Sequence, residues 1–327
     1  MNDLRQLDRN DILSMMRKQF KSKFIRLPEE VIIEITDEGD CLIVLQVSNI
    51  SNRGIRENGN AFEVWALAIY LSLGKRFRIV LDTDEQFELK EAEYKCSQHF
   101  CKFLYRTMKF SEKYNWFSLS DNLQRETDKF KDYLSKGIFT NSVPVGDARK
   151  ESSKECSAEA KLVIAGELAN KLKGQFDVGN GPVYRQFPIG LYEKNVSEEN
   201  KVFAEQKSAV NLWNINGEEF RIYELADWEK SIGIVTEIFF FSNFIRDLLL
   251  DGGLFTLNSD MNGDRGYRDI LSMKIKKVKA ILLSDRYHPV VSEEFVELMN
   301  RNSADIEYVR AVYRYCKHSQ TDKKAMP

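Results

Sequence analysis

The sequence lacks a marked excess of charge of either sign. Its 48 lysine and arginine residues are balanced by 50 aspartate and glutamate residues, which leaves a formal net charge of −2. A chain with this balance has no overall positive field to attract nucleic acid, so only a local basic patch could do so. With 327 residues, of which 43% are hydrophobic, the chain is long enough for two domains with ordinary cores.

Cysteine and histidine are too few and too scattered for most of the chemistry that depends on them. The five cysteines form an odd set that fits a reducing cytoplasm better than a disulfide framework. Cys96, His99 and Cys101 lie close together, but no second ligand pair follows at a zinc spacing, so we expect a packed helix there. The three histidines do not support a Ser/His/Asp catalytic set.

Segments for export or membrane insertion are also missing. The N-terminal stretch MNDLRQLDRNDILSMMRK lacks the apolar core of a signal peptide. The most apolar run, GIVTEIFFFSNFIRDLLL, carries Glu237, Arg246 and Asp247, so we expect a buried helix rather than a membrane span. We therefore expect a cytoplasmic protein without a membrane partner.

The apolar periodicity predicts an α/β protein in two parts. Helices and strands alternate in both halves of the chain. The main expected elements are a helix over about 9–21, strands over 30–36, 41–47 and 76–82 with a helix over 61–74 between the last two, a long helical stretch over about 87–135, a helix over about 157–173, a strand over 184–192, a hairpin, a helix over about 229–251, a strand over 278–285 and a helix that begins after Ser292.

A change in composition marks the expected domain boundary. The stretch SKGIFTNSVPVGDARKESSKECS loses periodicity and collects glycine, proline, serine and charge. We therefore expect one domain over residues 1–145 and a second over residues 155–320. The first is expected to serve recognition, regulation or assembly, including formation of a homodimer or binding of a partner protein.

The expected hairpin in the second half turns at Asn216-Gly217. Asn-Gly between two alternating runs is a strong hairpin signal, because both residues tolerate the positive φ that the turn needs. With these two as loop residues, Asn211 pairs with Ile222, and Glu224 lies diagonally from Asn211 on the same face. A polar oxygen and a carboxylate then point toward one place. We expect a one-residue shift of the turn to undo this arrangement.

The stretches around this hairpin form a known order of motifs. VNLW and YELA are the two strands, GIVTEIFFFSNFIRDLL is the following amphipathic helix, and SAEAKLVIAGELANKLKG is an upstream helix. Over roughly residues 155 to 290 this order resembles the PD-(D/E)XK, or restriction-endonuclease-like, nuclease superfamily. The resemblance implies a mixed sheet flanked by helices, preceded here by a second α/β domain. It also implies Mg²⁺-dependent or Mn²⁺-dependent hydrolysis of phosphodiester bonds by an endonuclease or exonuclease, in DNA rather than RNA, in restriction or antiviral (anti-phage) defence.

The resemblance assigns the catalytic positions to Asn211, Glu224 and Ala226. The superfamily has aspartate at the first of these positions and lysine at the third. An aspartate and a glutamate are anionic ligands for a hard divalent cation, with the backbone carbonyl of Leu225 as a further ligand and Glu167 of the upstream helix as a weaker one. A lysine would help to deprotonate water and to neutralise phosphate, which alanine cannot do. We therefore expect this chain to be catalytically impaired.

Several alternatives remain open at this stage. Ala226 could be an engineered change, a natural loss in a pseudonuclease, or a sign that the lysine has moved to Lys230. Glu224 and Asn211 could instead be ordinary polar residues at a strand end or edge, and Glu167 could be a solvated helix residue. The alternative function is a non-catalytic module that binds nucleic acid or protein.

The remaining candidates for nucleic-acid contacts are basic residues. Arg185 precedes the hairpin, and Lys274, Lys276 and Lys277 belong to the cluster KIKKVK, which could follow a phosphate backbone. A solvated edge strand that uses lysine against aggregation explains the cluster equally well. The stretch SNISNRGIRENGN contains Arg53 and Arg56 but lacks the order of a phosphate-binding loop, so we expect a mobile loop able to contact DNA.

Overall fold

The computed structural model describes most of the chain. The described residues are 7–36, 39–52, 54–142, 182–203, 209–226, 231–258, 266–284 and 286–312. The elements of the first half are α1 (Arg9–Gln19), β1 (Val31–Ile35), β2 (Cys41–Leu45), α2 (Val47–Asn52), η2 (Asn58–Asn60), α3 (Phe62–Ser72), β3 (Ile79–Thr83), η3 (Glu91–Cys96), α4 (Gln98–Lys113), β4 (Phe117–Leu119), α5 (Asp121–Lys136) and β5 (Phe139–Asn141). Those of the second half are β6 (Tyr184–Pro188), β7 (Leu191–Glu193), η4 (Glu198–Asn200), β8 (Lys201–Phe203), β9 (Ala209–Asn216), β10 (Glu219–Ala226), α7 (Ser231–Leu249), α8 (Tyr267–Ser272), β11 (Lys277–Ser284), α9 (Glu293–Asn300) and β12 (Ile306–Val312).

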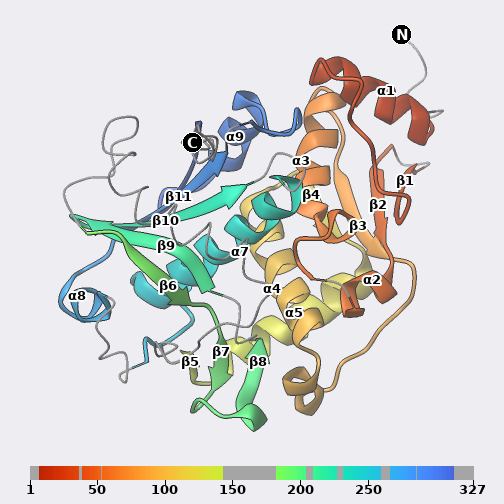
Figure 1. Cartoon of the computed structure of the whole chain (residues 1–327). Helices are drawn as coiled ribbons and strands as arrows, with labels where there is room; N and C mark the ends of the chain where they lie inside the picture. The colour runs from red at the N-terminus through yellow and green to blue at the C-terminus, as the bar shows by residue number, and fades with distance from the viewer. Residues whose placement is uncertain are drawn as a thin grey trace, which may run out of the picture.

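Two mixed sheets enclose a layer of helices. A four-stranded sheet has the order β1-β2-β3-β4, and a five-stranded sheet has the order β12-β11-β10-β9-β6. Helices α3, α4 and α7 lie between them (Figure 1), and a small sheet of order β5-β7-β8 lies at one end. The predicted α/β class is confirmed. Among the described residues, no helix is both long enough and apolar enough to cross a membrane.

The four-stranded sheet corrects one sequence prediction. The helical stretch expected over 87–135 is divided into α4 and α5 by the short strand β4. Phe117 and Leu119 alternate with Ser118, and the two apolar side chains are buried against the helices. Ser120 then caps α5 by accepting a hydrogen bond from the main-chain N–H of Leu123 at 3.4 Å.

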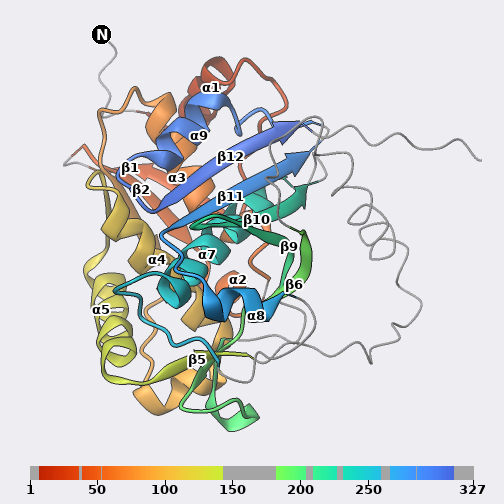
Figure 2. The same cartoon turned by 90° about the vertical axis from the view of Figure 1, so that its left-hand side faces the viewer.

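The five-stranded sheet holds the predicted hairpin and carries α7 across one face. Strands β6, β9 and β10 are antiparallel neighbours, whereas β10, β11 and β12 run parallel (Figure 2). The strand expected over 184–192 is divided, because β6 belongs to this sheet and β7 pairs with β5 in the small sheet. Helix α7 is apolar on nearly all sides, as expected for a helix that lies between two sheets.

The hairpin turns one residue later than predicted. Asn216 pairs with Glu219, so the two loop residues are Gly217 and Glu218. Only Gly217 of the pair has a positive φ, of 62°, which is typical of a type II′ turn with glycine at its first central position. The new register places Asn211 directly opposite Glu224 rather than diagonal to it. Moving a two-residue loop by one residue shifts the register by two, so both side chains keep the same face. The expectation that such a shift would undo the arrangement is therefore wrong, since Asn211 still contacts Glu224.

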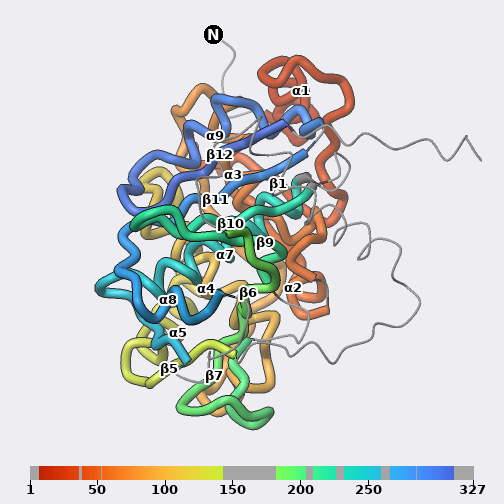
Figure 3. Tube along the Cα trace, turned by 60° about the vertical axis from the view of Figure 1, so that its left-hand side comes forward, coloured from red at the N-terminus to blue at the C-terminus, as the bar shows by residue number. Residues whose placement is uncertain are grey.

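Both halves of the chain contribute to one core. A continuous cluster of buried apolar residues extends from Ile12 to Tyr308. The hydroxyl of Tyr114 donates to the main-chain oxygen of Met299 at 3.1 Å, and α9 lies beside α1 and the end of α3 (Figure 3). The expected boundary between residues 145 and 155 lies outside the described residues, so the division into two domains stays a prediction.

Candidate functional site

Glu224 lies between the five-stranded sheet and helix α7, and none of its surface is exposed. It shares a face of β10 with Phe220 and Ile222, which are both buried in the core, because alternate residues of a strand point to one side. The explanation of Glu224 as a strand-end residue that reaches solvent is therefore wrong. A buried carboxylate is costly unless its oxygens are satisfied, so its partners explain how the residue is tolerated there.

Asn211 is the first partner of Glu224. Its main-chain N–H donates to Glu224 Oε1 at 3.3 Å, and its side-chain Nδ2 donates to Oε2 at 2.9 Å. The two side chains predicted to share a face do so, and they are in direct contact. In this arrangement the amide nitrogen, not the amide oxygen, faces the carboxylate. An aspartate at position 211 could not donate the second bond, so the two acids would need a proton or a cation between them.

Two further charged groups complete the cluster. The guanidinium of Arg56 donates from Nε to Glu237 Oε2 at 2.6 Å, and its Nη2 lies 2.5 Å from the same oxygen. Nη2 also lies 4.0 Å from Glu224 Oε2. The carboxylate that interrupts the apolar run of α7 therefore has a salt bridge, and it faces the buried Glu224. We call these four residues, Arg56, Asn211, Glu224 and Glu237, the acid cluster.

Arg56 reaches this place because its loop is seated on α7. A Cβ added at Gly233 would lie 1.9 Å from the carbonyl oxygen of Arg56, so the loop can pack here only against a glycine. From that point the arginine side chain extends one helical turn along α7. The loop is supported from the other side, where Asn60 Nδ2 donates to Asn49 O at 3.1 Å and Arg106 Nη2 donates to Asn60 O at 2.5 Å. The loop around Arg56 therefore has packing and hydrogen-bond contacts that the sequence, which suggested a mobile loop, did not predict.

The electrostatics of the acid cluster follow from burial and from its two carboxylates. Burial raises the pKa of Glu224 to about 8, and the charge of Glu237 acts in the same direction. Arg56 and the two hydrogen bonds from Asn211 oppose this rise. Burial alone would lower the pKa of the Arg56 guanidinium, but the charges of Glu237 and Glu224 outweigh it, so the net pKa is raised above its usual value. The arginine therefore stays charged, while Glu224 can hold a proton at neutral pH.

The other residues assigned by the resemblance are only partly placed. Leu225 packs on the opposite face of the sheet, and Ala226 ends β10, paired with Ser284 of β11. Glu167 and Lys230 lie outside the described residues. Within the described part of the chain, no group of three or more His, Cys, Asp and Glu side chains could hold a metal ion. The acid cluster still suits a cation chemically, because the cation of an arginine already lies against both of its carboxylates.

The basic residues singled out from the sequence are not gathered at the acid cluster. These lysines lie at the start of β11 or just before it, and each has an acidic partner: Lys274 pairs with Asp251, Lys276 with Glu218 and Lys277 with Glu307. Lysines neutralised in this way agree with a solvated strand better than with a path for phosphates. Arg185 is exposed on β6 and pairs with Leu212, whose side chain lies on the face of the sheet away from Glu224.

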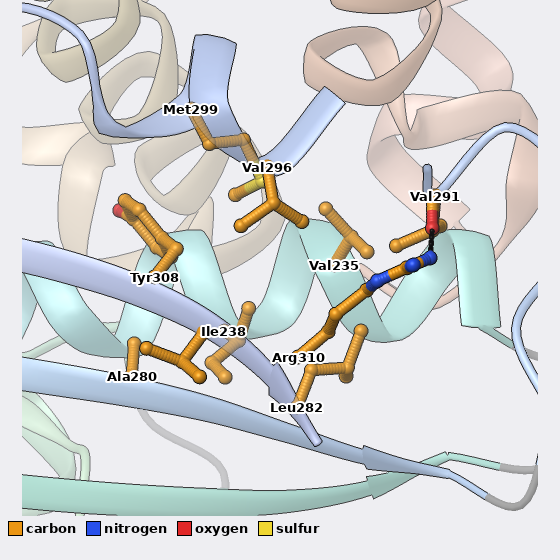
Figure 4. A pocket seen from close by; sticks show the side chains of 10 residues that line it. Val235, Ile238, Ala280, Leu282, Val291, Val296, Met299, Tyr308 and Arg310 are labelled. Carbon is orange, nitrogen blue, oxygen red and sulfur yellow. Dashed lines mark hydrogen bonds between the residues drawn. The ribbon is translucent and has the colours of Figure 1, made fainter. Parts of the chain in front are cut away.

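Neither of two cavities lies at the acid cluster. A void of about 10 Å³ lies between α7, α9, β11 and β12 (Figure 4). It is lined mostly by apolar side chains such as Val235, Ile238 and Met299, while Arg310 at its edge donates from Nη1 to Val291 O at 2.7 Å. A void of that size and lining is a packing gap with no room for a ligand. An open hollow of about 550 Å³ lies beside the four-stranded sheet, next to the ion pair of Arg78 and Asp40.

The comparisons with known proteins leave the function to be inferred from this geometry. No protein-family model, curated protein or solved structure matches the chain. The sequence alone does not connect Arg56 with Glu237. They are 181 positions apart, and no local pattern connects a loop arginine to a particular turn of a distant helix.

Proposed function

We propose that this chain is a nuclease of the PD-(D/E)XK type that is catalytically impaired at Ala226. Its active form would hydrolyse phosphodiester bonds with Mg²⁺ or Mn²⁺, in DNA rather than RNA, in the cytoplasm and in restriction or anti-phage defence. One observation carries the proposal: Asn211 and Glu224 contact each other across the hairpin, at the two positions where the resemblance puts the metal-binding acids.

The residues of the acid cluster fit the chemistry that this function requires. Glu224 and residue 211 would hold the divalent ion, which when bound polarises phosphate oxygens and lowers the pKa of water. Glu237 adds a second carboxylate that is 7% exposed and faces the same space. The buried position of Glu224 fixes its orientation, since the side chain is packed on one face of a central strand. The missing element is a cation at position 226 to assist the attacking water and the phosphate.

Restoring the usual residues tests the proposal. We expect the parent chain to show no Mg²⁺-dependent cleavage, and Ala226→Lys, alone or with Asn211→Asp, to cleave DNA. A positioned general acid or base of this kind typically contributes about 10²–10⁴-fold to a rate. Cleavage of duplex DNA, single-stranded DNA and RNA should be followed on gels with Mg²⁺ and with Mn²⁺.

The control for this experiment is Glu224→Gln in the restored chain, which should abolish any cleavage gained because it removes the central ligand. A doubly restored protein that is folded, yet inert on all three substrates, would contradict the nuclease proposal. Cleavage that survives Glu224→Gln would place the reaction elsewhere in the molecule.

A non-catalytic binding module is the second candidate, and the contact of Arg56 favours it. The guanidinium already neutralises Glu237 and lies near Glu224, so the acid cluster is satisfied without a metal. A protein of this kind would keep the scaffold to bind nucleic acid, a second copy of the chain or another protein. If the restored variant is inert and also shows no heat of Mn²⁺ binding in calorimetry, this candidate is the better one.

A further inference from the structure

Arg56 combines a fixed position with an open side. Its side chain is 45% exposed, although its guanidinium lies 4.0 Å from the wholly buried Glu224. Its two contacts with Glu237 are made by Nε and Nη2, one by each atom. Among the described residues, Nη1 has no hydrogen-bond partner. A guanidinium carries five N–H donors in a planar fork, so several of them remain available on the exposed side.

The position of Arg56 is set by the main chain as well as by the salt bridge. The glycine at 233 lets the Arg56 carbonyl approach α7, and Glu237, one turn further along that helix, receives the side chain. The loop is also held by hydrogen bonds, since the side chain of Asn60 donates to the Asn49 carbonyl and Arg106 donates to the Asn60 carbonyl. An arginine held at both its backbone and its head group loses less conformational entropy when it binds a ligand than a free surface arginine does.

The charge at this site differs from that of the lysine cluster. Lys274, Lys276 and Lys277 each have a surface acid as partner, and none of them lies at the acid cluster. Arg56 brings a positive charge close to Glu224. Glu224 lies on β10, the strand that has Ala226 where the resemblance expects a lysine. Glu224 itself is wholly buried, so a phosphodiester oxygen would meet the exposed side of the Arg56 guanidinium rather than the carboxylate. Arginine suits phosphate because its N–H groups match the geometry of the oxygens.

We propose that Arg56 is the phosphate-binding residue of this site, anchored by Glu237 and supplied to the second half of the chain by the first. The inference rests on the proposed function, since it assumes that the acid cluster receives a nucleic-acid backbone. It adds that recognition of the phosphate does not depend on residue 226. It also assigns Glu237 the task of positioning Arg56.

Binding, rather than cleavage, tests this role directly. The probe is a fluorescein-labelled duplex DNA with Mg²⁺, and the readout is fluorescence anisotropy over a series of salt concentrations. Arg56→Gln should weaken binding about tenfold, as expected for one charge-assisted phosphate contact, and should reduce the salt slope by about 1. Arg78→Gln is the matched control, because Arg78 is 52% exposed and pairs with Asp40 away from the acid cluster. It should leave both quantities unchanged.

A second variant separates binding from folding. Arg56→Gln leaves Glu237 without its cation, so Arg56→Gln with Glu237→Gln restores a neutral pair and should bind DNA as weakly as the single variant. Should either folded variant bind DNA with the parent's affinity and salt slope, Arg56 is only a structural counter-ion and this inference fails alone. A parent chain with no salt-dependent binding to DNA or to RNA would overturn the proposed function and this inference together.

Discussion

Glu224 owes its place to two partners that come from different parts of the chain. A carboxylate sealed between a sheet and a helix costs several kcal/mol if it is charged and unpaired. Asn211 supplies two hydrogen bonds from the neighbouring strand, and Arg56 supplies a nearby positive charge from the first half. Burial and Glu237 still favour the protonated carboxyl. The residue is therefore maintained at some cost, which is typical of functional sites rather than of cores.

The raised pKa of Glu224 predicts how stability changes with pH. The folded protein keeps this proton up to a pKa of about 8, whereas the unfolded chain releases it near 4.5. Between these values the folded state binds more protons than the unfolded state, so this group makes the free energy of unfolding fall as the pH rises from about 4.5 to 8. Below 4.5 both states hold the proton, and the effect is absent. Glu224→Gln removes this fall, so its stability should depend less on pH.

Urea denaturation of the parent and of Glu224→Gln at pH 5 and at pH 8 measures the difference. We expect the variant to gain stability relative to the parent on going from pH 5 to pH 8. The absolute stability is a poorer guide, because glutamine also changes the bonds with Asn211. Equal pH dependence in the two proteins would mean that Glu224 is ionised in the fold throughout this range.

At the scale of single elements, the hairpin shows which parts of a register can be predicted from the sequence. The alternating pattern of β9 and β10 gave the correct face for Asn211 and Glu224, because the face depends only on whether the register is odd or even. The predicted turn lies one residue before the observed one. An Asn-Gly pair suits a type I′ turn, but Gly217 alone satisfies a type II′ turn, and local sequence does not decide between them.

Helix α7 provides the second prediction at this scale. A side chain at Gly233 would overlap the carbonyl of Arg56 at 1.9 Å, and main-chain atoms on both sides leave little freedom to relax. Gly233→Ala should therefore destabilise the protein by about 1–3 kcal/mol through overpacking. Alanine favours a helix over glycine by roughly 1 kcal/mol, which reduces the loss but does not reverse it. The midpoint of urea denaturation measures the effect.

Gly54 is the matched control for this substitution. It belongs to the same loop as Arg56, but a Cβ added there would meet nothing within 4 Å. Gly54→Ala should change the stability by less than about 0.5 kcal/mol. If Gly233→Ala is equally neutral, the loop is not seated on α7 in the way described, and the anchoring of Arg56 would have to be reconsidered.

At the scale of the whole molecule, the sequence predicted the parts better than their assembly. The α/β class, the hairpin and the buried α7 follow from periodicity, since each element shows its own burial in its pattern. The packing of α3 and α4 against α7 does not follow, because an apolar helix surface does not specify its partner. The contact between Arg56 and Glu237 belongs to the same class of information. The two residues are 181 positions apart, and they meet because the glycine at 233 lets the Arg56 carbonyl approach α7 closely.

The shared core leads to a prediction about cooperativity. The sequence suggested two domains, but α3 and α4 of the first half pack on α7 of the second, and β5 pairs with β7 across the expected boundary. Neither half would keep its apolar surface covered if the other unfolded, so we expect a single transition in scanning calorimetry, with a calorimetric enthalpy equal to the van't Hoff enthalpy. Arg106 forms a buried ion pair with Glu63, which also accepts a hydrogen bond from Thr236 of α7. Arg106→Gln removes this ion pair and should lower the midpoint temperature without splitting the transition. Two separated transitions, or a split in the variant alone, would show instead that the halves fold as independent domains.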